Sequence, residues 1–212
     1  MNKFIKKFSE ISINDIESVG GKNASLGEMI NNLSSLGINV PDGFATTSYA
    51  FQEFLNANGL DKKIPELLKK LDVNSIKELK KTGSKIRNLI LKAKIPPELL
   101  KSIEEAWTNI CKNENYSFAV RSSATAEDLP NASFAGQQET YLNIVGLKAL
   151  VDAMQKVYAS LYTDRAIAYR VHQKFDHSDV SISVGFQRMV RSDKSTSGVM
   201  FTLDTESGSE DI

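Results

Sequence analysis

The stretch Ser117–Ile144, SFAVRSSATAEDLPNASFAGQQETYLNI, decides how the rest of the chain is interpreted. It begins with an apolar run at 118–120, of the kind found in buried strands, and becomes small and polar from Arg121 to Thr125. An acidic pair, a Pro-Asn turn and a second small-residue run lead to another strand-like segment that ends at Ile144. The pattern predicts two strands joined by a long polar loop.

Two functions are compatible with this loop. Backbone amides, hydroxyls and the guanidinium of Arg121 can converge on an anion, as they do in phosphate-binding loops. An ordinary polar hairpin with a solvated arginine has the same composition. Because the stretch follows neither of the familiar phosphate-loop patterns, composition alone leaves both interpretations open.

The composition is that of an ordinary globular protein and indicates no polyanionic partner. The 212 residues carry 26 basic and 26 acidic side chains, so the net charge is zero and nothing favours nucleic acid or a membrane surface. The single cysteine, Cys111, cannot form an internal disulfide, which favours a reducing, cytoplasmic location. We expect neither a secretory signal nor a membrane span.

A second candidate anion site precedes the first predicted helix. Gly20, Gly21 and Lys22 come directly before a helical pattern at Ser25–Leu36, with Gly37 as its C-cap. A helix N-terminus with a nearby ammonium favours an anion. By themselves these residues favour a capped helix with an exposed lysine, because they lack the full spacing of a phosphate-binding loop.

The remaining segments predict helices and a terminal hairpin. A turn at 41–43 and a short strand at Phe44–Thr46 precede a helix from Ser48 to about Asn58. A lysine-rich helical insert follows at about 61–111, and more helix lies between 147 and 175. Residues 180–204 predict a β hairpin whose strands are 180–187 and 197–202. No Cys, His or carboxylate cluster has metal-ligand spacing, and we assign His172 and His177 no chemistry.

Taken together, six blocks resemble the N-terminal nucleotide-binding domain of phosphoenolpyruvate synthases, members of the PEP-utilising dikinase family. They are VGGKNASLGEM at 19–29, VPDGF at 40–44, AVRSSATAEDLPNASFAGQQETYLNI at 119–144, YASLYTDRA at 158–166, QRMV at 187–190 and SGVMFT at 197–202. The resemblance covers nearly the whole chain. Pyruvate phosphate dikinase, rifampin phosphotransferase and glucan, water dikinase share parts of these blocks, and a non-enzymatic ATP-binding module is a further alternative.

The resemblance implies an α+β, ATP-grasp-like domain that handles ATP in a larger enzyme. In that family a swivelling phosphohistidine domain takes the β-phosphate of ATP, with release of AMP and phosphate, and passes it to pyruvate bound in a TIM barrel. Phosphoryl transfer of this kind depends on positioning and charge neutralisation. The implied partners are ATP, Mg²⁺ and pyruvate, and the full-length protein is expected to be a homodimer.

The resemblance also implies roles for individual residues. Arg121 would bind the ATP phosphates as a bidentate fork, and Lys22 would contact them from the helix N-terminus. The adenine pocket would be lined by Gln187, Met189 and Val190. The rest of the phosphate cradle would be formed by Ser122, Ser123, Thr125, Gly136 and Gln137.

Several parts of the family pattern do not occur in this sequence. The phosphohistidine motif and the pyruvate-binding domain are absent, and the Mg²⁺ ligands are expected downstream. We therefore expect residues 1–212 to be the N-terminal part of the ATP-binding domain of a longer enzyme, inactive by itself.

Overall fold

In the part of the chain that the structure describes, a five-stranded antiparallel sheet has helices on both faces. The computed structural model describes residues 2–112, 114–125, 139–175, 177 and 180–209. The strands are β1 (Ile5–Lys7), β2 (Gly43–Thr46), β3 (Ser117–Ala124), β4 (Thr140–Val145) and β5 (Ile182–Arg188), in the sheet order β1-β2-β5-β3-β4. The predicted mixed α+β class is confirmed.

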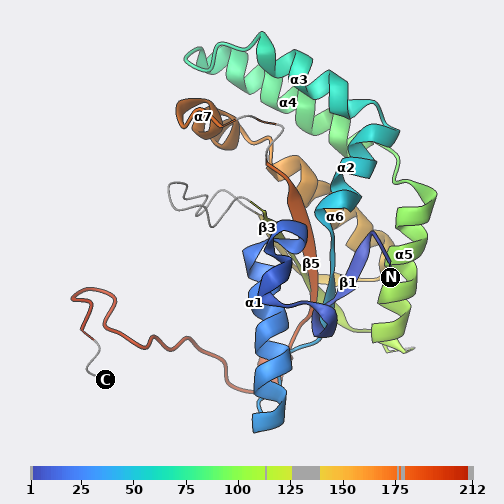
Figure 1. Ribbon diagram of the computed structural model, residues 1–212, viewed down its shortest axis with the longest axis vertical. Helices are drawn as coiled ribbons and strands as arrows, with labels where there is room; N and C mark the ends of the chain where they lie inside the picture. Colours follow the sequence, from blue (N-terminus) through green and yellow to red (C-terminus); the bar gives the residue numbers. More distant parts are fainter. Residues whose placement is uncertain (1, 113, 126–138, 176, 178–179, 210–212) are drawn as a thin grey trace.

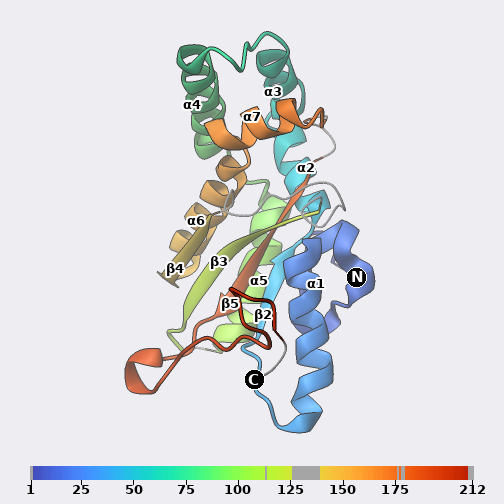
Figure 2. The same cartoon turned by 90° about the vertical axis from the view of Figure 1, so that its left-hand side faces the viewer.

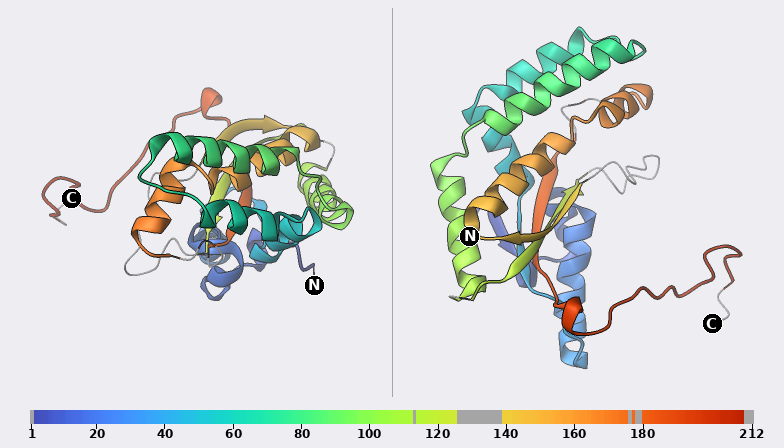
Figure 3. Two further views of the ribbon diagram at one scale, coloured as in Figure 1. Left: turned by 90° about the horizontal axis from the view of Figure 1, so that it is seen from above. Right: turned by 180° about the vertical axis from the view of Figure 1, so that it is seen from behind.

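One helix covers one face of the sheet and the remaining helices cover the other or extend beyond it. Helix α1 (Ile16–Leu33) runs along the first face, as Figure 2 shows. The opposite side carries α5 (Pro97–Cys111) and α6 (Leu147–Ser160). In the right-hand view of Figure 3 the sheet lies between α5 on one side and α1 on the other. The other helices are α2 (Ser48–Ala57), α3 (Leu60–Lys69), α4 (Ile76–Lys92) and α7 (Asp164–His172), the last three of which lie together at one end of the molecule (Figure 1).

The alternation of side chains along β5 separates two hydrophobic cores. Phe186 stacks on Phe44 of β2 at 4.7 Å between ring centroids and belongs to the larger core under the helical layer. The smaller core, on the α1 side, contains Val19 and Leu26 of that helix and Ala45 of β2. Because successive strand residues point to opposite faces, Ser183, Gly185 and Gln187 face α1.

The predicted terminal hairpin is wrong in its second strand. Its first strand exists as β5, but residues 197–202 form no strand and are exposed. The reason lies in the sheet order, since β5 is hydrogen-bonded to β2 on one side and to β3 on the other. Neither edge of β5 remains for a hairpin partner.

Two further boundaries differ from the sequence prediction. Strand β3 continues through Arg121 to Ala124, where small polar residues predicted a loop, because each of these residues pairs with one on β5. Helix α1 begins at Ile16, so the two glycines lie inside it, at a break where Gly20 has φ 75° and ψ 161°. The helix around Ser48 forms as predicted, with Thr47 as its cap.

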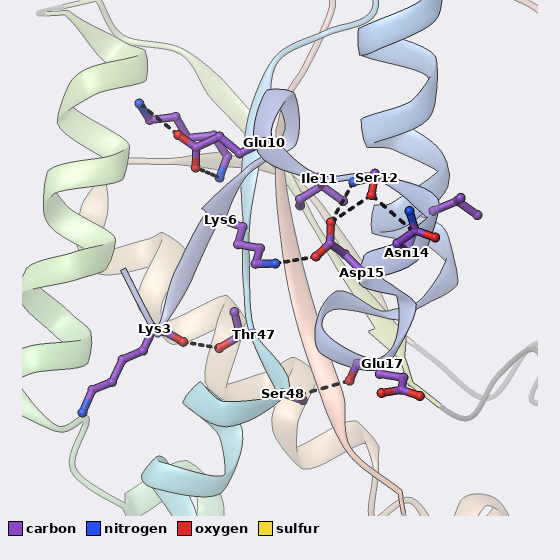
Figure 4. Close-up of polar contacts among 12 residues, drawn as sticks. Lys3, Lys6, Glu10, Ile11, Ser12, Asn14, Asp15, Glu17, Thr47 and Ser48 are labelled. Carbon is purple, nitrogen blue, oxygen red and sulfur yellow. Dashed lines mark hydrogen bonds and ion pairs between the residues drawn. The ribbon is translucent and has the colours of Figure 1, made fainter. Parts of the chain in front are cut away.

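A polar cluster holds the N-terminal segment against α1 and β2 (Figure 4). Asp15 accepts hydrogen bonds from Lys6 Nζ and from the Ser12 amide, the latter at 2.9 Å. The Lys6 ammonium, followed by the Ser12 amide, holds the pKa of the Asp15 carboxyl below its ordinary value of 3.8.

Along the exposed edge of the sheet, the Ile5 amide donates to the Asn2 side chain at 3.3 Å and the Lys7 amide to Glu10 at 3.4 Å. These side chains cap amides of an edge strand.

Asp15→Asn is expected to lower the free energy of unfolding by about 1 kcal/mol at neutral pH, since it removes a charge-assisted bond. A carboxyl whose pKa is lowered by folding stabilises the protein above its unfolded pKa, and this contribution is lost as pH falls through the folded pKa. The difference between wild type and variant should therefore shrink below about pH 4. Denaturant titrations at several pH values measure it.

The matched control is Asp152→Asn, which breaks the exposed Lys148–Asp152 pair on α6. It should change stability by less than about 0.5 kcal/mol. An Asp15→Asn difference that stays constant from pH 7 to pH 3 would contradict the assigned role of the carboxylate.

Candidate functional site

The broken helix α1 is fixed to the sheet by a buried polar network. Asn23, 2% exposed, donates from its side chain to the Val19 carbonyl at 3.0 Å and to Ser183 Oγ at 2.9 Å. Its backbone amide donates to Ser123 Oγ at 3.3 Å. Ser183 Oγ in turn donates to the Thr46 carbonyl. One asparagine thus connects α1 to β5 and β3, and through Ser183 to β2.

Two glycines make this close approach feasible. A Cβ on Gly20 would lie 2.3 Å from Ser123 Oγ, and a Cβ on Gly185 would lie 2.4 Å from Asn23 Oδ1. At φ 75° and ψ 161°, Gly20 also adopts a backbone conformation essentially restricted to glycine. The second segment of α1 therefore begins beside β3, with Lys22, half-buried, in its first turn.

Arg121 lies on the same face of the sheet as this network. Arg121 and Ser123 are two residues apart on β3, so their side chains point to the same face. Across the strand pair Arg121 lies opposite Gly185, which has no side chain to crowd it. The side chain is half-buried and makes no hydrogen bond or ion pair with the part of the chain that the structure describes. Two residues further along β5, Gln187 also faces this side and donates from Nε2 to the Pro41 carbonyl at 3.2 Å.

A concave pocket lies where β5 ends. It has a volume of about 480 Å³, and its wall includes Met189 and Val190, two of the residues predicted to bind adenine. The Met189 amide donates to the Ser117 carbonyl at 2.9 Å, which keeps this end of the strand paired. The four steps along the chain from Gly185 to Met189 cover roughly 13 Å of extended backbone. An extended nucleoside triphosphate covers a comparable length.

The pocket also contains residues that the sequence prediction missed. Tyr116 lies under the guanidinium of Arg188, whose central carbon is 4.8 Å from the ring centroid, and both side chains line the pocket. Pro41 and Val40 complete the apolar part of the wall. An aromatic residue just before the β3 strand and an arginine inside QRMV were the available signals.

Not all predicted phosphate ligands come together. Arg121 and Ser123 share a face, but Ser122 points to the opposite face and is buried. Ser123 is fully buried and accepts the Asn23 amide, so it supports α1 in this arrangement. Thr125 Oγ1 donates to the Ser181 carbonyl at 3.2 Å. Gly136 and Gln137 lie outside the described residues.

Comparison with known proteins gives the family. The sequence model of one protein family, described as the pyruvate phosphate dikinase AMP/ATP-binding domain, matches residues 16–212. The chain belongs to this family. It is 54% identical over 206 residues to phosphoenolpyruvate synthase of Escherichia coli (strain K12), covering 97% of this chain and 26% of the relative. It is 53% identical over 213 residues to the synthase of Pseudomonas aeruginosa (strain UCBPP-PA14), covering 100% of this chain and 27% of the relative.

The likeness extends to a third relative and covers a similar share of its length. Phosphoenolpyruvate synthase of Neisseria meningitidis serogroup B is 54% identical over 214 residues, covering 100% of this chain and 27% of the relative. The chain thus spans about a quarter of the length of the curated relatives it matches. No helix among the described residues is long and apolar enough to cross a membrane.

Gly20→Ala is expected to lower the free energy of unfolding by roughly 3 kcal/mol, because it combines a forbidden backbone conformation with a clash against β3. Denaturant titration measures the loss. Gly37→Ala is the matched control: Gly37 has φ 77°, but nothing lies within 4 Å of an added Cβ. Its cost should be about 1 kcal/mol. Equal losses for both variants would mean that the contact with Ser123 is unimportant.

Proposed function

We propose that this chain forms the nucleotide-phosphate side of the ATP site in a phosphoenolpyruvate synthase. The observation that carries the proposal is the placement of Arg121. Its guanidinium is half-buried, faces a glycine across the strand pair and is unbonded to the described residues, on the face where the second segment of α1 begins. A guanidinium held in this way is prepared to bind phosphate oxygens as a fork.

The division of labour between residues follows from their positions. Arg121 binds and neutralises the phosphates, while Lys22 and the amides of the first turn after Gly20 add positive potential. The adenine is held by Gln187, which faces the same side as Arg121, and by Met189 and Val190 on the wall of the pocket where β5 ends. The Tyr116–Arg188 stack forms a further part of that wall. Fixed charges of this kind are how proteins stabilise a phosphoryl group in transfer.

The overall reaction extends beyond this chain. We propose that the full-length protein is cytoplasmic and transfers the β-phosphate of ATP to a histidine and then to pyruvate, releasing AMP and phosphate. Pyruvate as the acceptor is supported by the name that the relatives carry, phosphoenolpyruvate synthase. The ATP-grasp-like architecture and the homodimer belong to the same proposal. Among the described residues no three His, Cys, Asp or Glu side chains gather in a way that could hold a metal ion.

We expect Arg121→Ala, made in the full-length protein, to reduce the rate of AMP formation from ATP by about 100-fold or more. The substitution removes a charge-assisted contact with the phosphates. Arg121→Lys should recover only part of the rate, because an ammonium cannot form the fork. The control is Arg165→Ala, an exposed arginine on α7, which should behave as wild type. An unchanged rate in Arg121→Ala would refute the site.

Val190→Asp tests the adenine end separately. Val190 is 67% exposed, so the substitution leaves the core intact while placing a carboxylate on the pocket wall. We expect KM for ATP to rise about tenfold, equivalent to ~1.4 kcal/mol of lost binding, with unchanged thermal stability. Val199→Asp, at a site 86% exposed and outside the pocket wall, is the control. A rise of KM in both variants would indicate a general charge effect.

A further inference from the structure

One end of the molecule carries an excess of positive charge. The segment 60–95, which contains α3 and α4, has 11 basic and 4 acidic side chains, so its net charge is +7. Because the whole chain is neutral, its other residues together carry −7. The α3–α4 pair lies beyond the sheet in Figure 1 and nearest the viewer in the left-hand view of Figure 3. The basic segment therefore forms a separate end of the molecule.

The charge is concentrated on the outward face of α4. This helix buries Gly83, Ile86 and Ile90 against the rest of the fold. At 3.6 residues per turn, the side directly opposite holds a row of exposed polar residues: Lys77, Lys81, Ser84, Lys85, Asn88 and Lys92. A shallow groove of about 440 Å³ runs along this row. Glu78, the one acidic residue of the helix, lies at the rim of this face in the first turn.

This arrangement is unfavourable for the helix by itself. Lys77, Lys81 and Lys85 follow one another at intervals of four residues, where like charges repel. Lys77 also lies in the first turn, at the positive end of the helix dipole, where a cation is unfavourable. On α5 and α6, in contrast, exposed lysines pair with a carboxylate one turn along. The four lysines of the α4 row make no ion pair with any residue that the structure describes.

We propose that the outward face of α4 is a docking surface for an acidic helix of a partner protein. Lys77, Lys81 and Lys85 rise about 6 Å from one to the next along the helix axis, and glutamates at the same four-residue interval on a facing helix match that spacing. The whole row up to Lys92 measures roughly 22 Å, about four turns of such a helix. Opposite charges at these positions would remove the repulsion along α4 and steer the two proteins together.

The composition of this face favours a protein over other polyanions. Residues 60–95 contain no aromatic side chain on which a base could stack or which could anchor in a membrane interface. The one arginine of α4, Arg87, pairs with Asp164 of α7 at 2.8 Å, so the outward face has no guanidinium fork for phosphates. A duplex or a membrane surface is longer than the lysine row and would also approach the acidic remainder of the chain. A short helix ends where the row ends.

The test is the fluorescence anisotropy of a labelled helical peptide with glutamates at every fourth residue, titrated with the full-length protein at low ionic strength. We expect saturable binding that weakens about tenfold as salt is raised to physiological strength, because the charges are exposed and become screened. Lys81→Glu should weaken binding about tenfold, since it places like charges opposite each other. This variant should melt at or above the wild-type temperature, because its carboxylate lies one turn from both Lys77 and Lys85.

The matched control is Lys101→Glu, which makes the same change of charge at an exposed lysine of α5 and should bind the peptide as the wild type does. Equal losses in both variants would mean that the peptide responds to overall charge, and the proposal fails. It also fails if the peptide does not bind at low salt, or if Lys81→Glu melts below wild type, since the row would then stabilise the fold itself.

Two further probes test the kind of partner. A peptide with the same residues in shuffled order should bind at least about threefold more weakly, and equal binding would refute a match between two helices. A short DNA duplex and vesicles that contain phosphatidylserine should bind more weakly than the ordered peptide. Tighter binding of either probe that is lost in Lys81→Glu would assign this face to nucleic acid or to a membrane and overturn the proposal.

Discussion

The contact between the broken helix α1 and the middle of the sheet brings the start of the second helical segment, with Lys22, onto the face of the sheet that carries Arg121. Asn23 can reach Ser183 because Gly185 leaves room for it, and Gly20 allows the helix to restart against Ser123. The network is buried, so each unmade bond would carry the full cost of desolvating a polar group. The same close approach that holds the helix leaves Arg121 facing an uncrowded position on β5.

Sequence alone predicted the elements whose signals are local. The α+β class, the helix capped near Ser48 and the first strand of the terminal hairpin are confirmed, because periodicity and capping residues act over a few positions. The second strand at 197–202 was wrong for a non-local reason. A strong strand pattern cannot pair with β5 when β2 and β3 already occupy both of its edges.

The candidate site was predictable in composition but less so in geometry. The arginine in AVRSSA and the QRMV block were identified from the sequence motifs alone. The extension of β3 through small polar residues, in contrast, depends on pairing with β5, which is far away in sequence. That extension decides which side chains share a face, and so separates Ser122 from Arg121. Asn23 was missed because asparagine is seldom fully buried, and only tertiary packing reveals that it is.

The position of β5 has a consequence for how this sheet is assembled. Among the described residues it comes last of the sheet's five strands along the chain, yet it lies at the centre, between the pair β1–β2 and the pair β3–β4. During synthesis from the N-terminus, the inner edges of β2 and β3 therefore stay unpaired until residues 182–188 emerge. Such a topology delays closure of the core and exposes strand edges that can capture other chains. Chaperone protection is most valuable for this sheet in the interval before β5 arrives.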